Sequence, residues 1–158
     1  MRILFSNPPW WEGTQSATDP QGRPFEAYVG GVRAGSRWPF TMLHAAPPDT
    51  PSYGGYLPYP FFMGYAATYA ARHTDADVVF RDSIALRESY ERYMAFVMQG
   101  GFDYIVIESA SPSWDHDQAL IETLDRCLPG VRIIVTGPIA SKATELLRDY
   151  PIHACIRG

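Results

Sequence analysis

Residues 102–113 read FDYIVIESASPS, a short apolar run followed at once by small polar residues. The apolar part, Tyr104–Ile107, is typical of a strand that is buried on both faces of a parallel sheet. The polar part, residues 108–113, predicts the loop that leaves this strand, and Ser113 is placed to cap a helix over Trp114–Cys127. The stretch therefore indicates a strand–loop–helix unit of an α/β protein.

The same pattern recurs on both sides of this unit. Further strands are predicted at Arg2–Ser6, Asp77–Arg81, Arg132–Thr136 and His153–Ile156, and further helices at Phe61–Arg72, at Leu86–Gln99 and from Ser141 or Thr144 to about Tyr150. Because crossovers between parallel strands are right-handed, this alternation predicts one α/β domain with a Rossmann-like, doubly wound five-stranded parallel sheet. We expect the flavodoxin-like strand order 2-1-3-4-5, with a ligand crevice at the carboxyl ends of the strands.

Composition bounds the classes of function. The chain has 158 residues, of which 46% are hydrophobic and 19% are charged, as expected of a globular domain. Its net charge of -4 argues against a nucleic-acid partner, because nucleic-acid binders usually carry a basic patch. No apolar run approaches the roughly 20 residues that span a bilayer, so no membrane partner is expected. Cys127 and Cys155 match no metal-ligand spacing and are expected to be reduced thiols in a cytoplasmic protein.

The segment from residue 8 to about residue 59 is rich in proline and aromatic residues, and it is predicted to be an irregular insertion after the first strand. Because disordered chains contain few aromatic residues, we expect it to pack against this domain or against a partner. Within it, Arg33 and Arg37 lie four residues apart and Trp38 follows them. Arginine forms forked bonds to carboxylate or phosphate, and tryptophan stacks on planar rings, so these three residues are a candidate roof or docking surface. A packed loop that holds the insertion down is the alternative.

In the expected strand order, the loops after Ser6, Glu108 and Thr136 converge at the crevice. Residues 109–113 and 136–138 are small and polar, so the backbone there could approach a bulky ligand closely. The alternative is that serine, glycine and proline simply form turns in these loops. Glu108 is a candidate polar contact or base, or else a buried carboxylate that accepts hydrogen bonds from nearby N–H groups.

Signatures of several other sites are absent from the sequence. No G-x-G-x-x-G or Walker-type glycine loop follows the first strand, and the glycine-rich residues 30–35 follow no predicted strand. Asp115, His116 and Asp117 are adjacent at a helix start, so their side chains point in different directions and predict no metal site. The sequence therefore predicts neither a catalytic set nor metal ligands, and it favours a binding module.

Several segments, in their order and spacing, resemble the N-terminal cobalamin-binding domain of cobalamin-dependent radical S-adenosylmethionine enzymes. They are RILFSNPPWW, GVRAGSRWPF, YLPYPFFMGYAA, RDSIA, FDYIVIESASPS, VTGPIAS and HACIRG, and they cover nearly the whole chain. The resemblance implies that cobalamin binds across the strand ends, with its nucleotide tail between the third and fourth strands. The cofactor-binding residues that it implies are Asn7, Pro8, Pro9 and Trp10, near the lower face of the corrin, and Glu108, Ser109, Ala110, Ser111, Pro112, Thr136, Gly137 and Pro138.

The sequence departs from related families in two ways. It lacks a CxxxCxxC motif, so an iron–sulfur cluster and S-adenosylmethionine would belong to a radical barrel, in cis or as a partner chain. Asn7 to Trp10 stand where cobalamin mutases have D-x-H-x-x-G, so we expect no histidine of this chain to bind cobalt and the dimethylbenzimidazole tail to be displaced from it.

The leading interpretation is therefore a cobalamin-binding module of a radical S-adenosylmethionine methyltransferase, without catalytic activity of its own. Two alternatives stay open at this point. One is a stand-alone α/β module for a nucleotide or a flavin. The other is a regulatory or docking domain that uses the aromatic segment as its contact surface.

Overall fold

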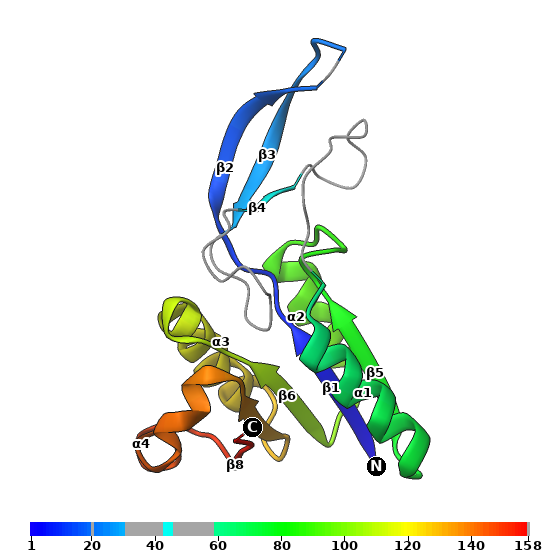
Figure 1. The fold of residues 1–158 in the computed structure, drawn as a ribbon, viewed down its shortest axis with the longest axis vertical. Helices are drawn as coiled ribbons and strands as arrows, with labels where there is room; N and C mark the ends of the chain where they lie inside the picture. The colour runs from blue at the N-terminus through cyan, green and yellow to red at the C-terminus, as the bar shows by residue number, and fades with distance from the viewer. Residues whose placement is uncertain (20, 31–42, 46–58, 158) are drawn as a thin grey trace.

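The structure is a computed structural model that describes residues 1–19, 21–30, 43–45 and 59–157. Its main sheet has five parallel strands in the order β5-β1-β6-β7-β8 (Figure 1). The strands are β1 (Arg2–Asn7), β5 (Asp77–Asp82), β6 (Tyr104–Glu108), β7 (Arg132–Thr136) and β8 (Ala154–Cys155). Numbered along the chain within this sheet, the order is 2-1-3-4-5, so the predicted fold class and strand order are confirmed.

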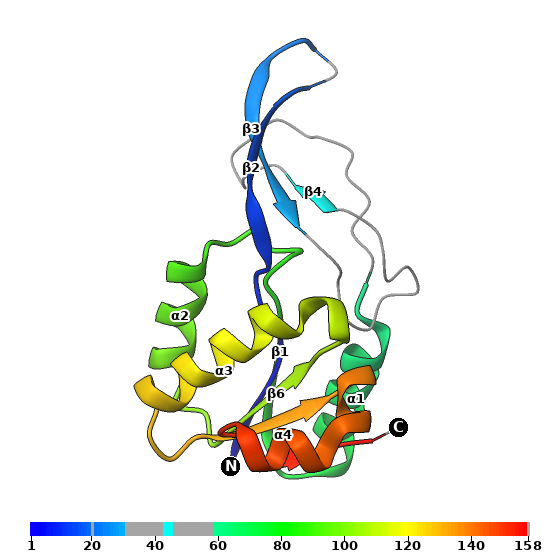
Figure 2. The same ribbon diagram turned by 90° about the vertical axis from the view of Figure 1, so that its left-hand side faces the viewer.

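The helices cover both faces of this sheet, as a doubly wound fold requires (Figure 2). They are α1 (Phe61–His73), α2 (Tyr90–Gln99), α3 (Trp114–Cys127) and α4 (Ala143–Asp149), with short 3-10 turns at η1 (Ser111–Ser113) and η2 (Pro138–Lys142). Helix α1 packs Met63 and Ala67 against one face, whereas α2, α3 and α4 pack against the other. None of the described helices is long and apolar enough to cross a membrane.

Two local predictions about the helices are wrong. The helix expected from Leu86 begins only at Tyr90, because Arg87 takes a positive φ of 52° and the side chain of Ser89 caps the helix by accepting from the N–H of Arg92. Ser113 does lie at the N-cap position of α3, but its hydroxyl makes no capping bond to the helix. It donates to the Asp117 carboxylate instead.

The prediction of an irregular insertion is wrong for the described part of residues 8–59. That part contains a three-stranded antiparallel sheet of β2 (Trp11–Thr18), β3 (Pro24–Gly30) and β4 (Leu43–Ala45). The turn between β2 and β3 is closed by Asp19, which accepts from the backbone N–H groups of Gln21 and Arg23 at 2.9 and 2.8 Å. The β2–β3 hairpin rises from the carboxyl end of β1, away from the main sheet (Figure 1). Arg33, Arg37 and Trp38, the predicted roof or docking residues, lie outside the described residues.

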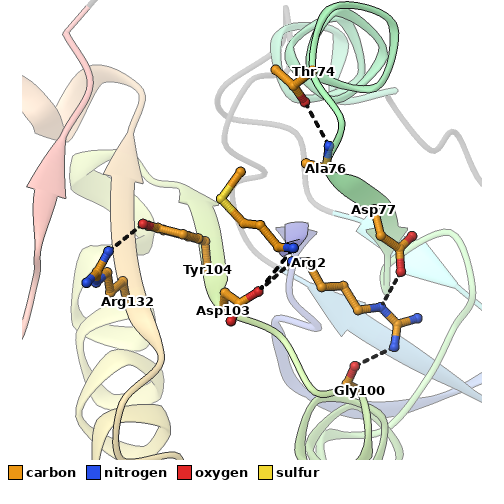
Figure 3. A network of polar contacts seen from close by, with 9 residues as sticks. Arg2, Thr74, Ala76, Asp77, Gly100, Asp103, Tyr104 and Arg132 are labelled. Atoms are coloured by element: carbon orange, nitrogen blue, oxygen red, sulfur yellow. Dashed lines mark hydrogen bonds and ion pairs between the residues drawn. The ribbon is translucent and has the colours of Figure 1, made fainter.

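The amino ends of the strands are tied together by polar contacts (Figure 3). Arg2 pairs with Asp77 at 2.9 Å and donates to the Gly100 carbonyl at 2.5 Å. Its backbone N–H donates to Asp103 at 2.6 Å. These contacts join β1 to β5 and to the residues that precede β6, so the centre of the sheet is held at this edge and the opposite, carboxyl edge carries the exit loops.

A buried hydrogen bond joins β1 to α2. The Tyr93 side chain is fully buried, and its hydroxyl lies 2.7 Å from the Ser6 hydroxyl in the centre of the sheet. Burial raises the pKa of Tyr93, so the phenol stays protonated.

We predict that Tyr93→Phe lowers the free energy of unfolding by about 1–2 kcal/mol, because the buried Ser6 hydroxyl loses its partner. Tyr104→Phe is the matched control, since its hydroxyl bonds Arg132 at an exposed position; its effect should stay within about 0.5 kcal/mol. Urea unfolding followed by circular dichroism measures both. Equal effects of the two variants would contradict the buried bond.

Candidate functional site

The switch point of the sheet lies between β1 and β6, where the chain direction of the crossovers reverses. Ser6 of β1 is in register with Ile107 of β6, and Glu108 of β6 is in register with Thr136 of β7. The three exit loops that the sequence singled out therefore leave the same edge of the sheet, side by side. This edge is the candidate site.

A row of polar residues follows this edge on the face that α1 covers. Phe80, Phe5, Val106 and Ile134, on four neighbouring strands, pack into the core beneath α1. Because side chains alternate along a strand, the residues two positions further on share that face. They are Asp82, Asn7, Glu108 and Thr136. We call this set the polar row. Within it, the Asn7 amide donates to Asp82 at 2.8 Å.

Glu108 is the unusual member of the polar row. Its side chain is 7% exposed, and its Oε2 atom has no hydrogen-bond partner among the described residues. Burial raises the pKa of this carboxyl from 4.5 to about 7. The alternative in which neighbouring N–H groups satisfy the carboxylate is wrong for this oxygen, so Glu108 remains a candidate polar contact for a ligand.

The serines of the β6 exit loop bond within the protein. On the other face, the hydroxyls of Ser109 and Ser113 donate to Oδ2 of the buried Asp117 at 2.5 and 2.7 Å. Burial raises the pKa of Asp117 to about 6, although both hydroxyl bonds oppose that rise. Ala110 is also buried, whereas Ser111 and Pro112 are exposed in η1. Asp117 therefore holds the loop in place, and only its exposed tip is open to other contacts.

Contacts within the protein, rather than a ligand, account for the glycine at position 137. It has a φ of 88°, and a Cβ atom there would lie 2.6 Å from the Ser109 carbonyl oxygen. The Ser109 N–H donates to the Thr136 carbonyl at 3.0 Å, and the Ile139 N–H donates to the Ser109 carbonyl at 3.3 Å. The β6 and β7 exit loops are thus hydrogen-bonded directly to each other. This favours the interpretation that residues 136–138 form a packed turn, in which Pro138 is the first residue of η2.

The β1 exit loop is packed rather than open. Pro8 and Pro9 are buried, and Trp10 is half-buried. The Trp10 ring stacks on the His116 ring, with the centroids 5.7 Å apart and the planes 28° apart. The sequence predicted no metal-ligand role for His116 and gave no sign that it would lie beside Trp10. The fold brings it here because the strand order 2-1-3 places the start of α3 beside the β1 exit.

The neighbours of His116 point elsewhere, as predicted. Asp115 is exposed and Asp117 is buried against the two serines, whereas His116 faces the β1 exit. No group of three or more histidine, cysteine, aspartate or glutamate side chains in the described part of the chain is placed to hold a metal ion.

A hollow of about 430 Å³ lies at the opposite edge of the sheet, lined by Met1, Asp103, Tyr104, Gly130 and Arg132. Figure 3 shows part of its polar wall, where Arg132 donates to the Tyr104 hydroxyl. Ligands of open α/β sheets bind at the carboxyl ends of the strands, and this hollow is at the amino ends. We therefore keep the carboxyl edge as the candidate site.

Comparisons of the chain with protein-family models, with curated proteins and with solved structures found no match. The case for a function therefore rests on the geometry of this edge and on the sequence pattern.

We predict that Glu108→Gln stabilises the protein at alkaline pH. The folded pKa of Glu108 lies above its unfolded value, so the folded state holds this proton more tightly, and stability falls as the pH rises from about 4.5 to about 7. Above that range the ionised carboxyl costs roughly 3 kcal/mol, an upper bound that glutamine avoids. Urea unfolding at pH 5 and pH 8.5 should show a gain for the variant only at pH 8.5. A pH-independent difference between variant and wild type would contradict the buried, unpartnered carboxyl.

We predict that Gly137→Ala destabilises the protein more than Gly130→Ala. Both glycines have positive φ, at 88° and 101°, but a Cβ atom at Gly130 meets nothing within 4 Å. The control should lose about 1–2 kcal/mol from backbone strain, and Gly137→Ala should lose a further 1–3 kcal/mol, roughly, from overpacking against Ser109. Thermal and urea unfolding give both values. Equal losses would show that the β6 and β7 loops can separate at little cost.

Proposed function

We propose that this domain binds cobalamin at the carboxyl ends of β1, β6 and β7, as the cofactor-binding module of a radical S-adenosylmethionine methyltransferase. Two lines support the proposal. One is the sequence resemblance, three of whose segments fall on β1, β6, β7 and the loops that leave them. The other is the strand order, which puts those loops at the switch point of the sheet.

The observation that carries the proposal is the unpartnered Oε2 atom of Glu108. Buried polar atoms almost always have a hydrogen-bond partner, so a donor supplied by a ligand accounts for this one. The rim of a corrin ring carries primary amides. With its pKa near 7, the Glu108 carboxyl can accept a hydrogen bond from an amide N–H and, when protonated, donate one to an amide oxygen.

The remaining residues have distinct roles in this proposal. Asn7, held by Asp82, and the buried Pro8 and Pro9 shape the floor beside the switch point. Asp117 fixes the β6 exit loop through its two serine hydroxyls. The nucleotide tail would lie along the outer edge of the loops at residues 109–113 and 136–138, because direct hydrogen bonds join these loops to each other.

When bound, cobalamin supplies a cobalt centre that accepts and donates a methyl group. The chain's own part is to bind the cofactor, to orient it and to keep water from its buried side. The two cysteines of the sequence cannot provide the three thiolates of a radical S-adenosylmethionine cluster. The radical step is therefore assigned to a barrel in cis or in a partner chain.

The test is to mix the purified chain with hydroxocobalamin up to high micromolar concentration, remove free cofactor by gel filtration and record the visible spectrum. We expect a retained corrin spectrum. Glu108→Leu removes the hydrogen bond at similar volume and should weaken binding by roughly two- to tenfold, the effect of one hydrogen bond. Glu122→Gln, at an exposed position on α3, is the control and should bind like wild type.

No retained corrin from a chain that circular dichroism shows to be folded would refute the proposal. Retention of flavin mononucleotide in a parallel run, without retention of cobalamin, would establish the flavin-module alternative instead.

A further inference from the structure

Trp10 occupies a distinctive place between two parts of the fold. It comes directly after the buried Pro9 at the exit of β1 and directly before Trp11, where β2 begins. Among the described residues, its one aromatic ring contact is the stack on His116. An indole with one face on another ring and a half-exposed position can take a second ring on its opposite face.

His116 is itself fixed by two hydrogen bonds from different elements. Its Nε2 atom lies 3.0 Å from the Pro9 carbonyl oxygen, and its Nδ1 atom lies 2.7 Å from the Tyr90 hydroxyl oxygen. The Tyr90 hydroxyl also contacts Nε2. The Tyr90 ring meets the His116 ring edge-on, with the centroids 5.2 Å apart. Three elements, the β1 exit, the start of α2 and the start of α3, therefore meet at this imidazole.

These bonds define the tautomer of the ring. A carbonyl oxygen can only accept a hydrogen bond, so Nε2 carries the proton that is donated to Pro9. The Tyr90 hydroxyl contacts both nitrogens of the same ring. Burial lowers the pKa of His116, which favours this neutral form.

We propose that Trp10 is a stacking platform for a planar ring ligand, and that His116 and Tyr90 are positioning residues that hold the platform at the switch point. The inference rests on the proposed function, in which the planar ring is the corrin of cobalamin. In this inference His116 supports the Trp10 ring and does not bind cobalt.

The platform explains why these three residues belong together. A stack of two rings resists tilting only if the lower ring is itself fixed, and the imidazole is fixed by its hydrogen bond to Pro9 and its contacts with Tyr90. The same bond to Pro9 anchors the backbone that carries Trp10. The Trp10 indole is thus held in two ways: one face stacks on the His116 ring, and the preceding residue, Pro9, is hydrogen-bonded to the same histidine.

The test uses the full chain labelled with 5-fluorotryptophan, which gives a fluorine resonance for each tryptophan. Trp10→Phe identifies the Trp10 resonance by its loss. The probes are hydroxocobalamin, cobinamide, which is the corrin without a nucleotide tail, and flavin mononucleotide. We expect the corrins to shift the Trp10 resonance, and Trp10→Leu to weaken both corrins equally by roughly two- to tenfold, the range of an aromatic stacking contact.

The positioning residues are tested separately. His116→Ala should move the Trp10 resonance in the absence of any ligand and weaken both corrins, whereas His116→Phe should restore part of the affinity because it keeps a ring beneath the indole. Trp114→Phe is the matched control. Trp114 lies at the start of the same helix, and its ring meets the Tyr150 ring edge-on rather than contacting Trp10, so this variant should bind both corrins like wild type.

Each outcome separates this inference from the proposed function. If wild type retains neither corrin, cobalamin binding is refuted; the platform survives only if flavin mononucleotide shifts the Trp10 resonance, and it is overturned if no probe does. If wild type binds corrin but Trp10→Leu binds equally well, the platform is overturned and cobalamin binding stands. A Trp10 resonance that is unmoved in His116→Ala overturns the positioning role.

Discussion

The pairing of β1 on both of its edges is the constraint on which the rest of the structure depends. Every residue from Arg2 to Asn7 is in register with β5, and residues Ile3 to Ser6 are in register with β6. The strand is therefore locked in the centre, with Leu4 and Ser6 wholly buried. Because β1 cannot slide against its neighbours without moving every apolar side chain to the wrong face, it determines which loops meet at the carboxyl edge.

Two of the buried carboxyl groups near that edge are in opposite situations. Asp117 receives two serine hydroxyls and secures the β6 exit loop, so its burial serves the fold. Glu108 is also buried, yet one of its oxygens has no partner among the described residues. An unsatisfied buried polar atom lowers stability, and such groups concentrate where a protein binds something. The contrast favours the polar row, which contains Glu108, as part of the candidate site.

The β2–β3 hairpin begins where β1 ends, so its direction and that of Trp10 are set by the same few residues. Pro8 and Pro9 restrict the backbone between the two sheets. The hydrogen bond from His116 to the Pro9 carbonyl oxygen ties this backbone to the start of α3. The hairpin is extended by β4 into a three-stranded sheet. At its start, the hairpin joins β1 through the short segment that also carries the proposed platform.

The sequence by itself determined the α/β class, the positions of the five strands of the main sheet and their order, because continuous apolar runs and right-handed crossovers are local or nearly local properties. It also placed the exit loops at one edge. Only the tertiary structure decided the hairpin, because β2 is mostly small and polar and the two strands are stabilised by pairing with each other. The same holds for the contact of His116 with Pro9, residues 107 positions apart, and for the packing of Gly137 on Ser109. Such contacts depend on the path of the whole chain, which brings distant residues together at distances that no local pattern encodes.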